Sequence, residues 1–250
     1  MSPEELQSEN AGASPVSADS MAEVSPGTDG RIDAGLTEDL ALGLLKRGDL
    51  PADDIEQVAK NAAVMKSRKV RLAVAAHPHA PRRIALRVIR ELYTFDLMQF
   101  SLMPAAAADL KRTADELLVA RIASISLGER ISLARRSSGL VAAALLVDKE
   151  SRVWQSALEN PRLTEAAIVK ALQRSDASTV FVEAMCHHAK WSLRHEVRVA
   201  LLRNAHTPLA RALEFARRLP PALLRDVLHA SRLPEKVKVY LRRELRGGGN

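Results

Sequence analysis

Apolar residues follow a helical spacing along almost the whole chain from Leu36 onward. In the segment that begins near Pro208, they stand three, four and seven positions apart, which places them on one side of a helix (Leu209, Ala212, Leu213 and Ala216). We expect Thr207 to cap this helix and Pro208 to take its first position, where a missing amide hydrogen costs nothing. No Asn-Gly or Asp-Gly turn joins two alternating apolar runs. The pattern therefore predicts an all-α fold.

Prolines mark several other helix starts. We expect helices to begin at Leu50-Pro51, Ala80-Pro81, Met103-Pro104, Pro220-Pro221 and Leu233-Pro234. Thr164 is the expected cap of a further helix, whose buried face carries Ile168, Ala171 and Leu172. The helices should have roughly 10 to 15 residues, a length that is marginally stable alone in water. Each must therefore be stabilised by its neighbours.

A short phrase that begins with valine recurs along the chain. Its valines are Val70, Val153, Val197 and Val237. They are 83, 44 and 40 residues apart, and 83 is close to two periods of about 42. Such a period is typical of helical repeat arrays of the HEAT or armadillo type. We expect each valine, with the small residue three positions later (Ala73, Ser156 and Ala200), to face the core.

A polar residue follows the first three valines by seven positions. These residues are His77, Asn160 and Asn204. We expect each to form hydrogen bonds at the end of its helix, and a partner helix to begin four residues later, at Pro81, Thr164 and Pro208. The pattern thus predicts an α-solenoid of about five stacked units, each of two antiparallel helices with a tight link. It fails between Tyr93 and Ser126, where we expect an irregular unit or a longer helix.

The link sequence resembles a known family. It reads Leu158-Glu159-Asn160-Pro161-Arg162-Leu163-Thr164 in its fullest form. This stretch and its relatives resemble bacterial HEAT-like repeats and are similar to leucine-rich-repeat-variant arrays with an Asn-Pro-x-Leu link. The resemblance covers roughly residues 66 to 245. It implies an α-helical solenoid that mainly binds other macromolecules.

Charge is divided unevenly along the chain. Residues 1–36 hold seven acidic residues against one arginine, a net charge of −6, and lack apolar periodicity. We expect a disordered acidic tail followed by a helical repeat domain over 37–250. Since the whole chain carries +7, the repeat domain carries +13. Residues 187–250 contain fourteen Lys and Arg against five acidic residues, so the excess is concentrated toward the carboxyl end.

The position after the recurring valine is basic in three of the four phrases. It holds Arg71, Arg198 and Lys238, which stacked units would align along one face. Nearby residues that would extend this stripe are Arg194, Arg203, Arg217, Arg225 and Arg242. Such a stripe can bind an acidic protein segment or phosphates. The same residues could equally cover a solvated outer surface with their long side chains.

Candidate chemistry outside this stripe is sparse. His77-Pro78-His79 and Cys186-His187-His188 could in principle ligate a metal, but neighbouring helical residues point about 100° apart and zinc ligands come in spaced pairs. No catalytic or phosphate-binding motif is present. We therefore expect no catalytic residue, cofactor, metal or small-molecule substrate, and an inert buried thiol at Cys186.

Cellular location follows from similar reasoning. A single cysteine fits a reducing compartment. The amino terminus lacks a signal-peptide pattern, and the longest apolar run, Val141 to Val147, is too short to span a membrane. We expect a cytoplasmic protein with no membrane partner.

These observations favour a non-enzymatic bacterial adaptor that binds a protein partner, an acidic one if the basic face is used. Nucleic-acid binding is the alternative, and the acidic tail could act as a tethered competitor for either ligand. A HEAT-like DNA glycosylase is a remote third hypothesis, because that family is similar in using Trp and Asp on a concave basic face. Candidates for those roles are Trp154, Trp191, Asp148 and Asp176. No motif of that family matches, and Trp154 fills the position of Arg71 and Arg198, which favours a core or groove role.

Overall fold

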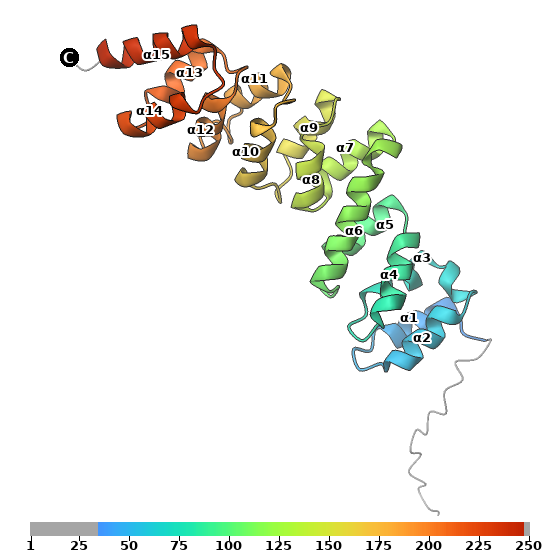
Figure 1. The fold of residues 1–250 in the computed structure, drawn as a ribbon. Coiled ribbons are helices and arrows are strands. Elements are labelled where there is room, and N and C mark those ends of the chain that lie inside the picture. Colours follow the sequence, from blue (N-terminus) through green and yellow to red (C-terminus); the bar gives the residue numbers. More distant parts are fainter. Residues whose placement is uncertain (1–34, 248–250) are drawn as a thin grey trace, which may run out of the picture. The chain divides into compact units, whose positions relative to one another are not determined.

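The computed structural model describes residues 35–247, with side chains to Arg243. Within this part of the chain the regular elements are fifteen α-helices and two short 3-10 helices, without a strand (Figure 1). The predicted all-α fold is therefore confirmed. The first helix begins at Glu38 and is capped by the Thr37 hydroxyl. Residues 1–34 of the expected acidic tail lie outside the described residues.

The helices are short and follow one another closely. In chain order they are α1 (Glu38–Leu45), α2 (Ala52–Lys60), α3 (Arg68–Ala76), α4 (Arg82–Glu91), α5 (Thr94–Leu102), α6 (Ala108–Arg121), α7 (Leu127–Arg136), α8 (Gly139–Leu145), α9 (Ser151–Leu158), α10 (Glu165–Gln173), α11 (Thr179–His187), α12 (His195–Arg203), α13 (Leu209–Ala216), α14 (Pro221–His229) and α15 (Glu235–Gly247). The 3-10 helices are Val64–Lys66 and Ile122–Ser124. Most α-helices have 7 to 10 residues and are shorter than expected, while α6, with 14, is the longer helix predicted between Tyr93 and Ser126.

Most of the proline signals mark helix starts correctly. Pro51 and Pro81 are the N-caps of α2 and α4, and Pro221 is the first residue of α14. The expected start at Pro104 is wrong. Residues 103–106 form a turn closed by a hydrogen bond from the Ala106 amide to the Met103 carbonyl, and α6 begins only at Ala108.

The helix expected after Thr207 forms, but two of its details differ. Pro208, not Thr207, is the N-cap of α13. The Thr207 side chain is buried and its hydroxyl donates to the Leu201 carbonyl 2.6 Å away, so it closes the preceding helix. Leu209, which was expected in the core, is 42% exposed, whereas Phe215, which was not, is buried.

The recurring valines mark every third helix. Each is the third residue of its helix, in α3, α9, α12 and α15. The gap of 83 residues is filled by Leu110, the third residue of α6, which gives intervals of 40, 43, 44 and 40 residues. The expectation of two helices per unit is therefore wrong: one period of about 42 residues holds three helices. The sequence analysis missed this position because leucine replaces valine and α6 continues for an extra turn.

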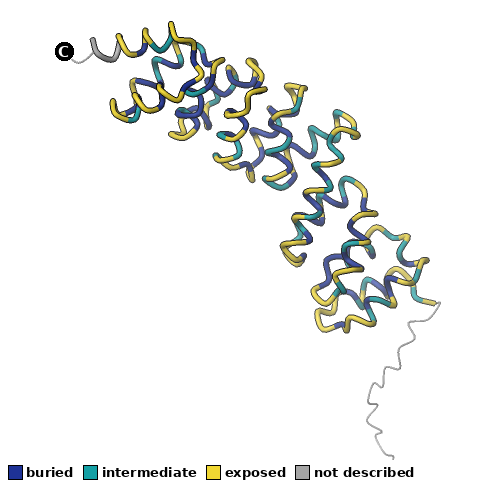
Figure 2. The backbone as a smooth tube through the Cα atoms, in the orientation of Figure 1, coloured by how far each residue is buried: buried dark blue, intermediate teal, exposed yellow. Residues whose placement is uncertain are grey.

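Helix contacts follow the same period. The principal contacts join helices one or two places apart along the chain, including α1 with α3, α4 with α6, α7 with α9, α10 with α12 and α13 with α15. Buried apolar residues form one cluster between Ala41 and Leu241. Figure 2, which colours the backbone of every buried residue dark blue, shows buried positions along the whole row of helices. Each helix therefore buries its apolar side mainly against near neighbours in the sequence.

Four polar side chains join the ends of helices that are two places apart along the chain, and we call these contacts the helix-end joints. Each comes from the end of α3, α6, α9 or α12 and donates to a backbone carbonyl at the end of the helix two places earlier. The pairs are His77 Nε2 with Arg47 O (2.9 Å), Arg121 Nη1 with Leu92 O (2.6 Å), Asn160 Nδ2 with Ala134 O (2.9 Å) and Asn204 Nδ2 with Leu172 O (2.7 Å). The predicted hydrogen-bonding role of His77, Asn160 and Asn204 is confirmed.

Two further bonds link helices with the same spacing. The indole Nε1 of Trp191, in the loop after α11, donates to the Leu158 carbonyl of α9 at 3.2 Å. The Ser231 hydroxyl, just beyond α14, donates to the Leu202 carbonyl of α12 at 2.6 Å. These bonds satisfy carbonyls that short helices leave unpaired at their C-terminal ends.

Candidate protein-binding surface

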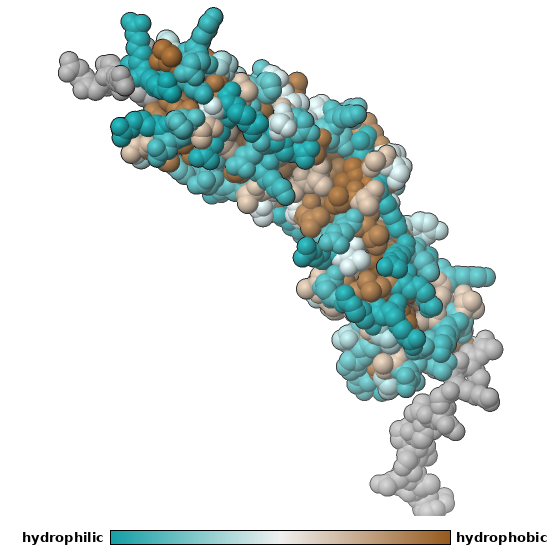
Figure 3. All heavy atoms as spheres, viewed as in Figure 1, coloured by the Kyte–Doolittle hydropathy of each residue, from teal (hydrophilic) through white to brown (hydrophobic). Residues whose placement is uncertain are grey.

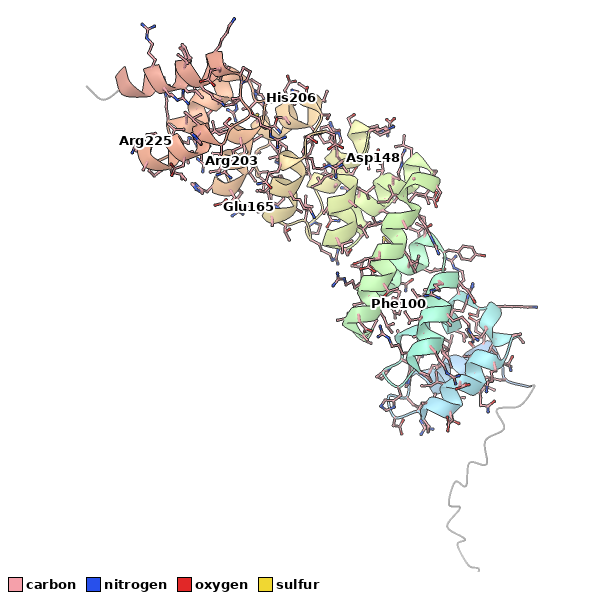
Figure 4. All side chains as sticks on the ribbon, in the orientation of Figure 1. Phe100, Asp148, Glu165, Arg203, His206 and Arg225 are labelled. Atoms are coloured by element: carbon pink, nitrogen blue, oxygen red, sulfur yellow. The ribbon has the colours of Figure 1, made fainter. Side chains whose placement is uncertain are left out.

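Seven of the eight predicted binding residues lie on or beside the last four helices. Arg194 is the N-cap of α12, and Arg217 the C-cap of α13. Arg198 and Arg203 lie within α12, Arg225 within α14, and Lys238 and Arg242 within α15. Figure 4 labels Arg203 and Arg225 along one edge of this region and His206 at the opposite edge. The eighth residue, Arg71, lies on α3, whose principal contacts are with α1, α2, α4 and α5, so the structure does not bring it to the others.

The residues at the recurring basic position are used within the fold. Arg198 is half-buried and its Nη2 donates to the Leu193 carbonyl at 2.7 Å. Arg71 is also half-buried, and its guanidinium carbon lies 5.7 Å from the centre of the exposed Tyr93 ring. Arg198 thus contacts the loop before its own helix, and Arg71 contacts the residue that caps α5. The recurring basic position therefore does not form a continuous row of side chains that are free to bind a ligand.

Two basic residues of α15 share one carboxylate. Lys238 Nζ lies 3.7 Å from Glu235 Oε2, and Arg242 Nη1 lies 3.2 Å from Glu235 Oε1. The Lys238 side chain is only 14% exposed. Glu235 thus compensates part of the basic charge at this end of the chain.

The remaining four arginines have no such ion pair within the part of the chain whose side chains the structure describes. Among the described residues, no hydrogen bond or ion pair reaches the side chains of Arg194, Arg203, Arg217 or Arg225. Three are exposed, while Arg203 is half-buried with its Nε atom enclosed and unpaired. We call this set the unpaired arginines. Guanidinium groups in this state can bind carboxylates or phosphates without first breaking an internal contact.

The tryptophans and aspartates considered as glycosylase-like candidates contact other residues of the fold. Trp154 is buried against Phe181, with ring centres 5.5 Å apart. The Asp148 carboxylate is almost fully enclosed and accepts two bonds from Arg130 Nη1, at 3.0 and 3.2 Å. Asp176, by contrast, is exposed and pairs with Arg174 at 2.7 Å. The structure does not gather the tryptophans and aspartates into one open site.

Two of the candidate metal-binding histidines and the cysteine likewise have structural roles. His77 and His79 each have a ring nitrogen bonded to a backbone carbonyl, of Arg47 and Leu50 respectively. No cluster of three or more potential metal ligands occurs within the described residues. Burial raises the pKa of the Cys186 thiol to about 11, which keeps it protonated and poorly nucleophilic near neutral pH.

An apolar groove between α8 and α10 is a surface feature that the sequence analysis did not identify. It has a volume of about 610 Å³ and is lined mainly by alanines of both helices. Leu140 and Val147 contribute from the α8 side, and Lys170 and Arg174 from α10. Figure 3 shows hydrophobic surface, drawn brown, gathered where Figure 1 places α8. The only signal in the sequence was the high alanine content of the two helices. This content is equally typical of tight packing between helices, so it does not identify a groove.

Comparisons with known proteins add no identification. A scan against protein-family models finds no match, and searches of curated proteins and of solved structures find no significant match. Separately, no helix in the described part of the chain is long and apolar enough to cross a membrane.

Proposed function

We propose that the chain is a non-enzymatic cytoplasmic scaffold, built as an α-solenoid of five three-helix units, which binds an acidic protein partner through the unpaired arginines. The contacts between near neighbours and the period of about 42 residues support the solenoid. Three-helix repeats of this length are typical of armadillo-type arrays. The resemblance of the link sequence to bacterial HEAT-like repeats supports the same proposal.

The observation that carries the binding role is that Arg194, Arg203, Arg217 and Arg225 form no side-chain ion pair or hydrogen bond with any residue whose side chain the structure describes. Glu214, three positions before Arg217, already pairs with Arg211 and Arg218, and Glu235 pairs within α15. Glu196 and Asp226 are closer in sequence to Arg194 and Arg225, but neither forms an ion pair with these arginines among the described residues. Arginine is enriched in protein interfaces because its planar head binds carboxylates through two parallel hydrogen bonds. An acidic segment of a partner would supply those carboxylates.

Charge reversal of the full-length chain tests this role. Replacing Arg194, Arg217 and Arg225 by Glu should weaken capture of the partner from a lysate of the source cells by about tenfold or more, because opposed charges become like charges. The matched control replaces Arg87, Arg90 and Arg152, which are also exposed, by Glu, so that the net charge changes equally. Equal capture by both triple variants would contradict the proposal.

Nucleic-acid binding is the second candidate, favoured by the excess of fourteen basic over five acidic residues in residues 187–250. Binding to phosphates predicts an affinity that falls steeply with salt, whereas a packed protein interface depends on salt more weakly. Titration of labelled duplex and single-stranded DNA and RNA at several salt concentrations separates the two. No binding at low salt would remove this candidate.

A further inference from the structure

The groove between α8 and α10 leaves apolar surface exposed at its edge. Leu140, the second residue of α8, is 45% exposed, and Val147, two residues beyond the end of that helix, is 43% exposed. Between them, Ala143 and Ala144 face Ala167 and Ala171 of α10 across the groove. Within the described residues no other segment lines this groove. Because the side chains at the bottom of the groove are small, the backbone of a docked segment can approach closely. An α-helix with small or apolar residues on one face can bind in this way.

One end of the groove is fixed by close packing. Gly139, the first residue of α8, lies so near the Arg162 carbonyl that an added Cβ would collide with it. The Thr164 hydroxyl, also in the groove lining, accepts from the Ala167 amide at 3.3 Å and so caps α10. The walls are therefore set by contacts within the fold, which lowers the ordering cost of binding.

The charged residues of the groove are both basic. Arg174 is held by Asp176, with Nη2–Oδ2 and Nε–Oδ1 distances of 2.7 and 2.8 Å. Lys170 is exposed and forms no ion pair with any residue that the structure describes. No acidic side chain lines the groove. An occupant that places a carboxylate opposite Lys170 would match this charge, as in other charge-complementary interfaces.

We infer that this groove binds an amphipathic helical segment of a partner protein, with apolar residues against the alanine floor and an acidic residue beside Lys170. The inference rests on the proposed scaffold function and adds a second contact surface to it. A second copy of the chain is a poorer occupant, because a symmetric contact through the groove would bring Lys170 of both copies into one interface whose lining offers no acidic side chain. A small ligand is also a poorer occupant, because the groove lacks the convergent polar groups that orient small molecules in their pockets. Its one hydroxyl, that of Thr164, already caps α10.

Selection of helical peptides from a display library on the immobilised full-length chain tests the inference. Enriched peptides should combine apolar residues three and four positions apart with Asp or Glu. Fluorescence anisotropy should then show binding that weakens about tenfold or more with Ala166→Trp, which fills the groove from the exposed second residue of α10. Lys170→Glu should weaken the same peptides and favour basic ones instead.

Matched variants separate the groove from general effects. Ala222→Trp places the same side chain at the exposed second residue of α14, and Lys69→Glu changes an exposed lysine of α3. Neither should alter binding. Peptides that are indifferent to Ala166→Trp but lost on reversal of the unpaired arginines would overturn the groove and leave the scaffold proposal standing. A library that yields no binding peptide would count against both, and a dimer in sedimentation that Ala166→Trp dissociates would assign the groove to self-association instead.

Discussion

Asn204 at the end of α12 donates a 2.7 Å hydrogen bond from its side-chain amide to the carbonyl of Leu172 in α10, thirty-two residues earlier. The side-chain oxygen of Asn204, Oδ1, accepts a hydrogen bond from the backbone amide of His206 at 2.9 Å. One enclosed side chain thus ends its helix, shapes the following turn and joins that helix to another. Asn160 makes the same two kinds of contact with α7 and with the Arg162 amide.

Removal of Asn204 should therefore destabilise the fold more than a typical polar substitution. Asn204→Ala leaves the Leu172 carbonyl buried without its partner, and should lower the free energy of unfolding by about 2 kcal/mol, as measured by urea denaturation. Asn204→His should recover part of the loss, because His77 forms both contacts at the equivalent position.

The control for this prediction is Asn61→Ala. Asn61 accepts from the Ala63 amide at 3.0 Å in its own turn and is only half-buried. Its loss should cost no more than about 1 kcal/mol. Equal costs for the two alanine variants would show that the helix-end joints contribute nothing beyond local turn geometry.

The sequence predicted the helical class, most helix starts and the role of His77, Asn160 and Asn204. It did so because apolar spacing and turn residues act over a few positions, within reach of local reading. The number of helices per period was predicted wrongly because most helices have 7 to 10 residues instead of the roughly 10 to 15 expected, so that one period holds three. Leu110 was missed for a different reason: it replaces the recurring valine, and Arg121 forms the joint of α6 with a different side chain. Equivalent geometry from unlike residues leaves no sequence pattern to detect.

The candidate surface stays a prediction, and the internal contacts of its basic residues could not be derived from the sequence for a related reason. Repetition singled out Arg71, Arg198 and Lys238, but repetition reports what every unit needs for folding, and two of these side chains contact their own flanking backbone or carboxylate. Arg194, Arg217 and Arg225 lie outside the recurring position and are exposed. Whether an arginine has an internal partner depends on packing between helices, which the sequence alone does not specify.

Asp115 should make stability depend on pH. Burial, followed by weaker repulsion from Glu116, raises the pKa of this carboxyl, while Ser138 and Ser101 act in the opposite direction. Its Oδ1 atom is enclosed and has no hydrogen-bond partner among the residues that the structure describes. A raised pKa in the folded state means that the protonated form is favoured: its contribution is complete below the ordinary value near 3.8 and is lost as pH rises through the folded-state value.

Asp115→Asn should accordingly stabilise the protein at neutral pH, by about 1 kcal/mol, because a neutral amide avoids enclosing a charge. The gain should shrink as pH falls toward 4, where the wild-type carboxyl takes up its proton. Thermal unfolding followed from pH 4 to 8 measures this, with the exposed Asp39→Asn as control. A gain that is constant with pH would show that ionisation of Asp115 is not its source.

Replacing either of two glycines near helix starts by alanine should change the free energy of unfolding, in opposite directions at the two positions. At Gly139 an added Cβ would collide with the Arg162 carbonyl, so Gly139→Ala should destabilise the protein by about 2 kcal/mol. At Gly128, the second residue of α7, the added methyl meets open space, and Gly128→Ala should stabilise by about 0.5 kcal/mol through helix propensity. Urea denaturation of both variants is the measurement. A matching sign at the two positions would mean that α8 is not fixed against the loop before α10.

Cys186 should resist modification for as long as the protein is folded. Its thiol is enclosed in α11, and burial, only partly offset by the positive charge of Arg211, raises its pKa to about 11. Since the thiolate is the reactive form, alkylation by iodoacetamide at pH 8 should be slower than that of an exposed cysteine by about a hundredfold or more. Mass spectrometry of the intact chain follows the reaction, and Ser175→Cys, in the exposed loop after α10, provides a reactive comparison in the Cys186→Ala background. Denaturant should make Cys186 react at the rate of that control, whereas rapid alkylation without denaturant would require that α11 opens readily.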